Sequence, residues 1–181
     1  MTTLNDPGGL LKHSMIPKAN TNRRYPLLVG FLLGLIQTGL FFQLTFTLSS
    51  GFTTYLLIVI CWLIGSAAGV YYVSRWNINL RALLIIMLVA YFLSGWLANI
   101  NPFNTRIWLI YAVLIGIAGL YPGVFFARAS AFYSARALFF WENNGFIAGL
   151  VITTILFMLM GRAVLWTLPV LVAAFVWLVS P

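Results

Sequence analysis

The stretch that decides the fold reads FFWENNGFIAG and runs from Phe139 to Gly149. It opens an apolar segment of about 20 residues, which is long enough for one α-helix to cross a lipid bilayer. Glu142 within it is the only acidic residue after position 6 of the chain. On a helix, Glu142, Gly145 and Gly149 lie on one face because their spacing is i, i+3 and i+7. We therefore expect a membrane-spanning helix that places a carboxyl group beside a smooth strip where a second helix packs closely.

The composition of the whole chain indicates a membrane protein. Of its 181 residues, 62% are hydrophobic and only 7% are charged, whereas roughly a quarter of the residues of a soluble domain are charged. The mean hydropathy is +1.01. We expect an all-α, polytopic integral membrane protein with no soluble domain. Its single cysteine, Cys61, lies in an apolar run and cannot form an internal disulfide.

The hydropathy pattern predicts a six-helix transmembrane bundle in residues 26–181, after a polar, basic cytoplasmic tail in residues 1–25. The connections between the apolar runs are short, and residues 99–104 (NINPFN) form a clear turn cluster. The six predicted spans cover residues 26–48, 53–74, 78–98, 106–127, 138–160 and 162–180.

The basic residues predict the orientation of the bundle. With the N-terminus in the cytoplasm, only Arg106 and Arg162 fall on the outer side. This distribution follows the positive-inside rule, so we expect both termini in the cytoplasm and a multi-pass protein of the bacterial inner (plasma) membrane. The residues on the cytoplasmic side are Lys12, Lys18, Arg23, Arg24, Arg75, Arg81, Arg128 and Arg136.

Pairs of glycines spaced four residues apart predict close helix packing of the GxxxG kind, because the missing side chains let two backbones approach. With the expected orientation, every pair lies in the cytoplasmic half of its span. The bundle should therefore be tight at its cytoplasmic end, and any crevice should open outward or sideways into lipid. The pairs are Gly30/Gly34, Gly65/Gly69, Gly119/Gly123 and Gly145/Gly149.

Glu142 needs a partner if it lies in the membrane, because an intramembrane carboxylate is normally paired. We expect an ion pair with an arginine of the cytoplasmic side. Two other roles stay open for Glu142, namely a proton or cation relay and an anchor for a partner subunit. The candidate ion-pair partners are Arg75, Arg81, Arg128 and Arg136.

Asn143, Gln37 and Gln43 are further polar groups within predicted spans. The amide of Gln37 lies near mid-membrane, where it can bond to another helix or bind a small polar ligand or a quinone oxygen. Residues 125–137 mix arginines with aromatic residues. They form either an amphipathic helix in the interface, where Arg128 and Arg136 contact anionic lipids, or a helical hairpin that extends two spans.

A family resemblance rests on residues 34–37 (GLIQ), 51–55 (GFTTY), 65–69 (GSAAG, followed by Arg75) and 138–149. These segments are similar to the membrane module of bacterial spermidine-synthase-like (polyamine aminopropyltransferase-like) multi-span proteins. An asparagine of that family corresponds to Glu142, and the sequence contains no soluble synthase domain. The resemblance implies a membrane module without its enzyme, and therefore no aminopropyl-transfer chemistry.

The reactive side chains argue against catalysis. His13 is the only histidine and Cys61 the only thiol, so the chain offers no cluster of metal ligands. It also contains no Gly-rich phosphate-binding loop. We expect no catalytic residue, no metal, no cofactor and no nucleic-acid partner.

The remaining functions are those of a non-catalytic membrane protein. We expect an accessory, scaffold or assembly subunit of a larger membrane complex, with membrane lipids and other membrane protein subunits as partners. An alternative is a small-solute transporter or permease that works as an oligomer, since six spans divide into three plus three as inverted repeats do. However, we find no clear internal sequence repeat, and the glycine pairs fall on one membrane side, whereas an inverted repeat would place them on opposite sides. A third alternative is a lipid- or quinone-binding membrane subunit.

Overall fold

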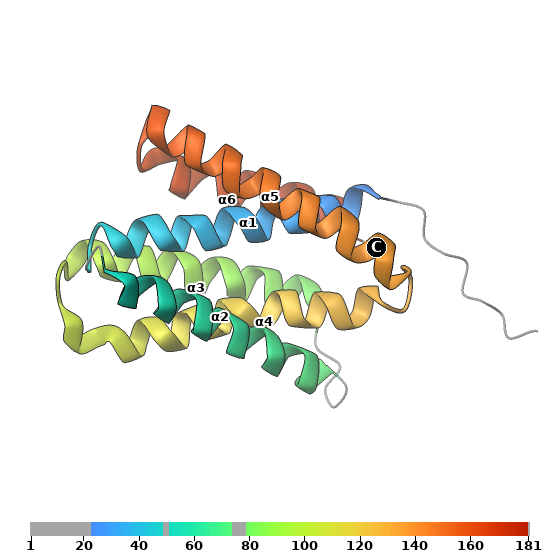
Figure 1. Ribbon diagram of the computed structural model, residues 1–181, viewed down its shortest axis with the longest axis horizontal. Helices are drawn as coiled ribbons and strands as arrows, with labels where there is room; N and C mark the ends of the chain where they lie inside the picture. The colour runs from blue at the N-terminus through green and yellow to red at the C-terminus, as the bar shows by residue number, and fades with distance from the viewer. Residues whose placement is uncertain (1–22, 49–50, 74–78, 181) are drawn as a thin grey trace, which may run out of the picture.

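The computed structural model describes residues 23–48, 51–73 and 79–180, and these residues form α-helices joined by short turns, with no strand among them. Residues 1–22 of the predicted tail (residues 1–25) and Arg75 lie outside the described residues, and the first helix already begins at Arg24. In order, the elements are α1 (Arg24–Thr45), α2 (Phe52–Val73), α3 (Leu80–Ile100), the 3-10 turn η1 (Thr105–Ile107), α4 (Trp108–Ala129), α5 (Ala135–Met160) and α6 (Ala163–Val179) (Figure 1).

Five of the helices are long and apolar enough to cross a membrane, namely α1 to α5. The predicted all-α fold is confirmed, and each predicted span lies within about three residues of an observed helix. α6 is shorter, with 17 residues. At 1.5 Å per residue it extends over about 26 Å, slightly less than the roughly 30 Å of a bilayer core.

The segment at residues 125–137 is a helical hairpin rather than a separate interfacial helix. α4 continues to Ala129 and α5 begins at Ala135, so only residues 130–134 form the turn. Ser134 caps α5, because its hydroxyl accepts a hydrogen bond from the backbone N–H of Ala137. Of the two predicted arrangements, an interfacial helix and a helical hairpin, the structure shows the hairpin.

The helices form two groups of three, which lie in the upper and lower halves of Figure 1. In the α1 group, α1 packs along α5 and also contacts α6. In the α4 group, α4 packs along α2 and also along α3. Contacts between the groups are sparser and involve mainly α1 with α2 and α3, and α3 with α6.

The two groups correspond to one another when the chain is shifted by three helices. This shift turns α1, α5 and α6 into α4, α2 and α3, and it preserves the main contacts, since α1–α5 becomes α4–α2 and α1–α6 becomes α4–α3. Three helices in series reverse the chain direction, so the groups run in opposite senses. The main helix contacts therefore match those of an inverted repeat. The glycine pairs do not, because an inverted repeat would place them at opposite ends of the bundle and all of them lie toward one end.

Glycines form the seams inside each group. A Cβ atom added to Gly30 would overlap the backbone carbonyl oxygen of Glu142, and one added to Gly145 would overlap that of Leu27. The α2–α4 seam is built in the same way, with the pair Gly65 and Gly69 facing the backbone of α4. The glycines facing a partner backbone are Gly30, Gly34, Gly65, Gly69, Gly119, Gly123, Gly145 and Gly149.

Both seams join helices that run in the same direction. Along α1 and α5, Leu27 meets Gly145 and Phe31 meets Gly149, so the residue numbers rise together. The two seams also lie toward the same end of the bundle. We call this end, at the right of Figure 1, the basic end, and the opposite end the far end. The basic end carries Arg23, Arg24, Arg81, Arg128 and Arg136.

Candidate functional site

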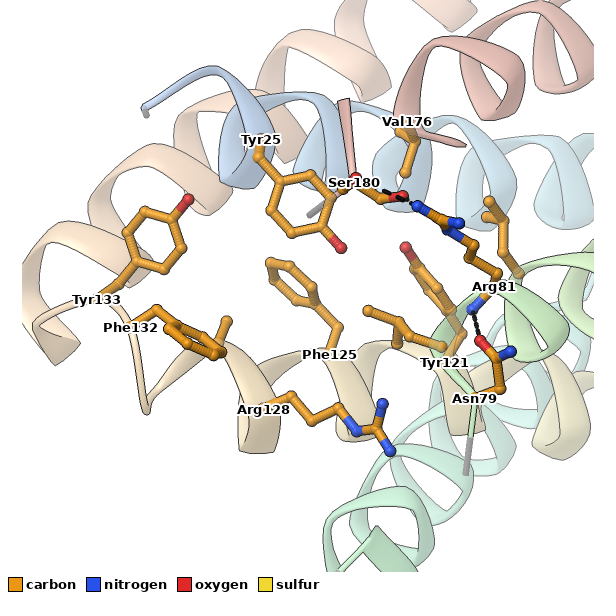
Figure 2. A pocket seen from close by; sticks show the side chains of 13 residues that line it. Tyr25, Asn79, Arg81, Tyr121, Phe125, Arg128, Phe132, Tyr133, Val176 and Ser180 are labelled. Atoms are coloured by element: carbon orange, nitrogen blue, oxygen red, sulfur yellow. Dashed lines mark hydrogen bonds between the residues drawn. The ribbon is translucent and has the colours of Figure 1, made fainter. Parts of the chain in front are cut away.

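A cavity of about 560 Å³ opens at the basic end, between the two helix groups (Figure 2). Its walls come from the starts of α1 and α3, the ends of α4 and α6, and the turn after α4. Aromatic, apolar and cationic side chains dominate the lining. The lining residues are Tyr25, Asn79, Leu80, Arg81, Leu84, Tyr121, Phe125, Arg128, Ala129, Phe132, Tyr133, Val176 and Ser180.

The position of this cavity corrects a prediction. The glycine pairs led us to expect crevices that open only outward or sideways, yet a cavity of about 560 Å³ lies at the end that carries the pairs. The physical reason is that the glycines draw α1 to α5 and α2 to α4 within each group. They do not draw one group to the other, so space remains between the groups at that end.

The wall of the cavity that α1 and α4 supply is aromatic and rigid. Tyr25 and Phe125 are both buried, and their rings meet edge to face with centroids 5.7 Å apart. The hydroxyl groups of Tyr25 and Tyr121 point into the same space (Figure 2). Tyr133 adds a third phenol, and burial raises its pKa, so it stays protonated near neutral pH.

Arg81 stands at the rim of the cavity and joins α3 to α6. Its Nε donates to the hydroxyl oxygen of Ser180 at 3.2 Å, and its Nη2 donates to the carbonyl oxygen of Ser180 at 3.5 Å. The guanidinium also lies 5.5 Å from the ring centre of Trp177. These contacts fix its orientation, and a guanidinium fixed in this way recognises carboxylates and phosphates well.

The far end is closed by polar contacts between the groups. Arg162 donates from Nη1 to the side-chain oxygen of Asn99 at 2.8 Å, and the backbone N–H of Phe103 donates to the carbonyl of Thr47 at 2.6 Å. The small cavity beside these residues has a volume of only about 10 Å³. Such a space holds about one water molecule, so the described residues leave far less room between the groups at the far end than at the basic end.

Gln43 lies beside this small cavity. Its side-chain oxygen and nitrogen are buried and have no hydrogen-bond partner among the described residues. Its amide packs against Gly95, where an added Cβ would overlap the Gln43 oxygen.

A second large cavity, of about 550 Å³, is a groove between α1, α2 and α5. Gln37 and Thr38 of α1 and Thr154 of α5 are its polar lining residues, and apolar residues such as Phe41 and Ile58 supply the rest. This groove opens on the side of the bundle, as the sequence analysis expected for a crevice.

Glu142 has a different environment from the one predicted. It lies on the face of α5 that packs against α1 and is only 8% exposed, yet no ion pair or hydrogen bond links its carboxyl group to another described residue. Arg81 is engaged with Ser180, and Arg136 is exposed. Glu142 lies inside the α1–α5 seam, away from Arg81 on α3. Arg75 lies outside the described residues, so the predicted ion pair with that arginine stays a prediction.

The structure places the site residues predicted from the sequence in different environments. Arg81 and Arg128 meet at the basic-end cavity, whereas Arg136 and Asn143 are exposed on α5. Within the described part of the chain, no group of three His, Cys, Asp or Glu side chains could hold a metal ion.

Sequence reasoning missed the tyrosines of the site. Tyr25 lies at the start of α1 and Tyr133 in the turn after α4, where aromatic residues ordinarily anchor a helix in the interface, whereas Tyr121 lies inside α4. Their only distinguishing signal is that three phenols and two arginines gather at one predicted membrane face.

Comparison with known proteins finds no relative of this chain. No family model, no curated protein and no solved structure matches this chain. The resemblance to the membrane module of spermidine-synthase-like proteins therefore stays a prediction.

Proposed function

We propose that the protein is a small-solute permease of the bacterial inner membrane, with the basic end in the cytoplasm. The observation that carries this proposal is the pair of helix groups with corresponding contacts and with a cavity of about 560 Å³ between them at the basic end, against one of about 10 Å³ at the far end. Transporters of this kind move a solute by rocking one bundle against the other around a central site.

The seam between α3 and α6 is the natural pivot for such a motion. These helices correspond to each other under the three-helix shift, and they are linked at three levels. Arg81 bonds to Ser180 at the basic end, Tyr91 bonds to Leu165 within the bundle, and Asn99 accepts from Arg162 just before α6 at the far end. Polar contacts of this type can be broken and formed again more readily than glycine seams.

Cysteine labelling tests the proposal without knowledge of the solute. In a Cys61→Ala background, Ala129→Cys reports on the basic-end cavity and Thr47→Cys on the far end. We expect a membrane-impermeant methanethiosulfonate reagent to label Ala129→Cys and to leave Thr47→Cys unmodified.

Asn99→Ala removes the far-end bond to Arg162. In detergent-solubilised protein, where the reagent reaches both ends, this change should raise labelling at Thr47→Cys and lower labelling at Ala129→Cys, because in alternating access the far end opens as the basic end closes. Asn101→Ala is the control, since Asn101 lies at the same end and takes no part in that bond. If labelling at the two positions does not change, or changes at one position without the opposite change at the other, alternating access is ruled out.

A second candidate function is the accessory subunit of a larger membrane complex, and one observation favours it. Asn143 and Asn144 are exposed on α5, two to three turns from its start, in a helix long enough to span a membrane. Exposed amides are costly in hydrocarbon and commonly bond to a neighbouring helix.

The size of the purified particle tests this second candidate. The wild-type protein in mild detergent should be larger than one 20.2 kDa chain, and an Asn143→Leu/Asn144→Leu variant should shift toward the monomer. Val151→Ala, on the exposed surface of the same helix, is the control. A wild-type monomer would contradict the subunit function, and a plain homo-oligomer would favour the permease.

A further inference from the structure

The basic-end cavity has the size of a site for a small organic molecule. Its volume of about 560 Å³ lies within the range of roughly 300–1,000 Å³ that ligand pockets occupy. Three of its ring-bearing residues, Tyr25, Tyr121 and Phe125, are at most 4% exposed, so this wall is already assembled without a ligand.

The charged groups of the lining are cationic. Arg81 and Arg128 are the ionised side chains, and none of the described lining residues is acidic. A guanidinium offers five N–H donors, of which Ser180 engages only Nε and Nη2 of Arg81. The Nη1 group of Arg81 has no partner among the described residues and is free to bind an anion at the rim.

The aromatic wall of the cavity, formed by Tyr25, Phe125 and Tyr121, suits the flat apolar part of a ligand. Tyr25 and Phe125 present ring edges and faces, and Tyr121 lies beside them (Figure 2). Aromatic rings are attracted to one another in offset and edge-to-face arrangements. The hydroxyl of Tyr121 donates to that of Tyr25, so the Tyr25 hydroxyl is the one that can donate to an oxygen of the ligand.

We infer that this cavity binds an organic anion, in which a carboxylate or a similar group is attached to an aromatic or other apolar body. The anionic group would meet Arg81 at the rim, and the body would lie against Tyr25 and Phe125. This inference rests on the proposed permease function, because it names the class of solute that the cavity would accept. An anionic lipid has the same chemistry, with a headgroup in place of the carboxylate.

Ligand-induced stabilisation tests the inference. The full chain is placed in nanodiscs of uncharged phosphatidylcholine and heated with 2-naphthoate or with 2-naphthamide, which has nearly the same shape and no charge. We expect 2-naphthoate to raise the melting temperature and 2-naphthamide to have no effect. Equal stabilisation by both probes would overturn the requirement for an anion.

Substitutions at Arg81 locate the binding. Arg81→Gln should weaken 2-naphthoate binding about tenfold or more, since it removes a charge-assisted bond. Arg81→Lys keeps the charge and should retain most of the affinity, although it also loses the bond from Nε to Ser180. Arg136→Gln is the control, because Arg136 is exposed near the same end and does not line the cavity. Equal weakening by Arg136→Gln would overturn the proposed site.

Nanodiscs that contain phosphatidylglycerol distinguish a lipid from a free solute. Stabilisation by this lipid that depends on Arg81, without any effect of 2-naphthoate, supports the anion site and assigns it to a headgroup. Stabilisation by neither probe would overturn the inference. The labelling experiment on Ala129→Cys and Thr47→Cys is independent of these results, so the permease proposal and the anion site can fail separately.

Discussion

The hydroxyl of Tyr91 on α3 donates a hydrogen bond of 2.9 Å to the carbonyl oxygen of Leu165 on α6. Pro169, four residues after Leu165, has no backbone N–H, so this carbonyl lacks its usual helical partner. Gly39 of α1 leaves the space for the Tyr91 hydroxyl, which an added Cβ would overlap. The proline thus frees an acceptor, and a tyrosine from the other helix group occupies it.

Removal of this hydroxyl should destabilise the protein. In Tyr91→Phe the buried carbonyl of Leu165 loses its donor, and we expect a loss of about 1–3 kcal/mol in the free energy of unfolding. Tyr111→Phe is a matched control, because the buried Tyr111 hydroxyl has no partner among the described residues. Its loss should leave stability unchanged or improve it. Thermal unfolding in detergent measures both, and equal effects of the two variants would refute the role assigned to Tyr91.

Two glycines of α4 should respond differently to alanine. A Cβ at Gly119 would lie 2.5 Å from the carbonyl oxygen of Trp62, whereas one at Gly116 would lie 3.7 Å from that of Cys61. Gly119→Ala should therefore force α2 and α4 apart and cost about 1–3 kcal/mol. Gly116→Ala should be neutral or stabilising by up to about 1 kcal/mol, since alanine favours a helix. The melting temperatures of the two variants test this prediction. A lower melting temperature for Gly116→Ala than for Gly119→Ala would contradict the close packing of α2 against α4 at Gly119.

Glu142→Gln should not destabilise the protein. The carboxyl group is buried and has no ion pair among the described residues, so the amide removes a charge from the membrane without breaking such a pair. We expect stability that is unchanged or higher by up to about 3 kcal/mol. The measurement is thermal unfolding at pH 8. A clear loss of stability would indicate a hidden cationic partner, for which Arg75 is the first candidate.

Reporter fusions should place the basic end in the cytoplasm. A fluorescent protein fused after Ser180 should be bright, and alkaline phosphatase inserted after Asn101, at the far end, should be active. The reason is the excess of arginine at the basic end, where Arg23, Arg24 and Arg81 lie. The reverse pattern of the two reporters would invert the proposed direction of the cavity.

The positions of the helices could be predicted from the sequence because long apolar runs are interrupted only by turn residues. α1 was expected from residue 26 and begins at Arg24, and α5 was expected from residue 138 and begins at Ala135. The errors lie at helix ends, where Ser134 supplies a cap that the apolar pattern does not reveal.

The partners of the helices could not be predicted. A glycine pair such as Gly30/Gly34 indicates that some backbone comes close, but it does not specify which one, since the glycine pairs are alike. Only the structure pairs α1 with α5 and α2 with α4. The cavity was missed for the same reason, because it arises between the two groups, and Tyr25 and Tyr121 come from helices far apart in sequence.

The glycine seams also have a consequence for biosynthesis. α2 and α4 lie between α1 and α5 in the chain, so the two pairings are nested like brackets and do not cross. The inner pair can close once Ala129 has left the ribosome, whereas α1 waits until α5 is complete. During that interval the glycine face of α1 has no helix packed against it, so the insertion machinery or lipid must cover it.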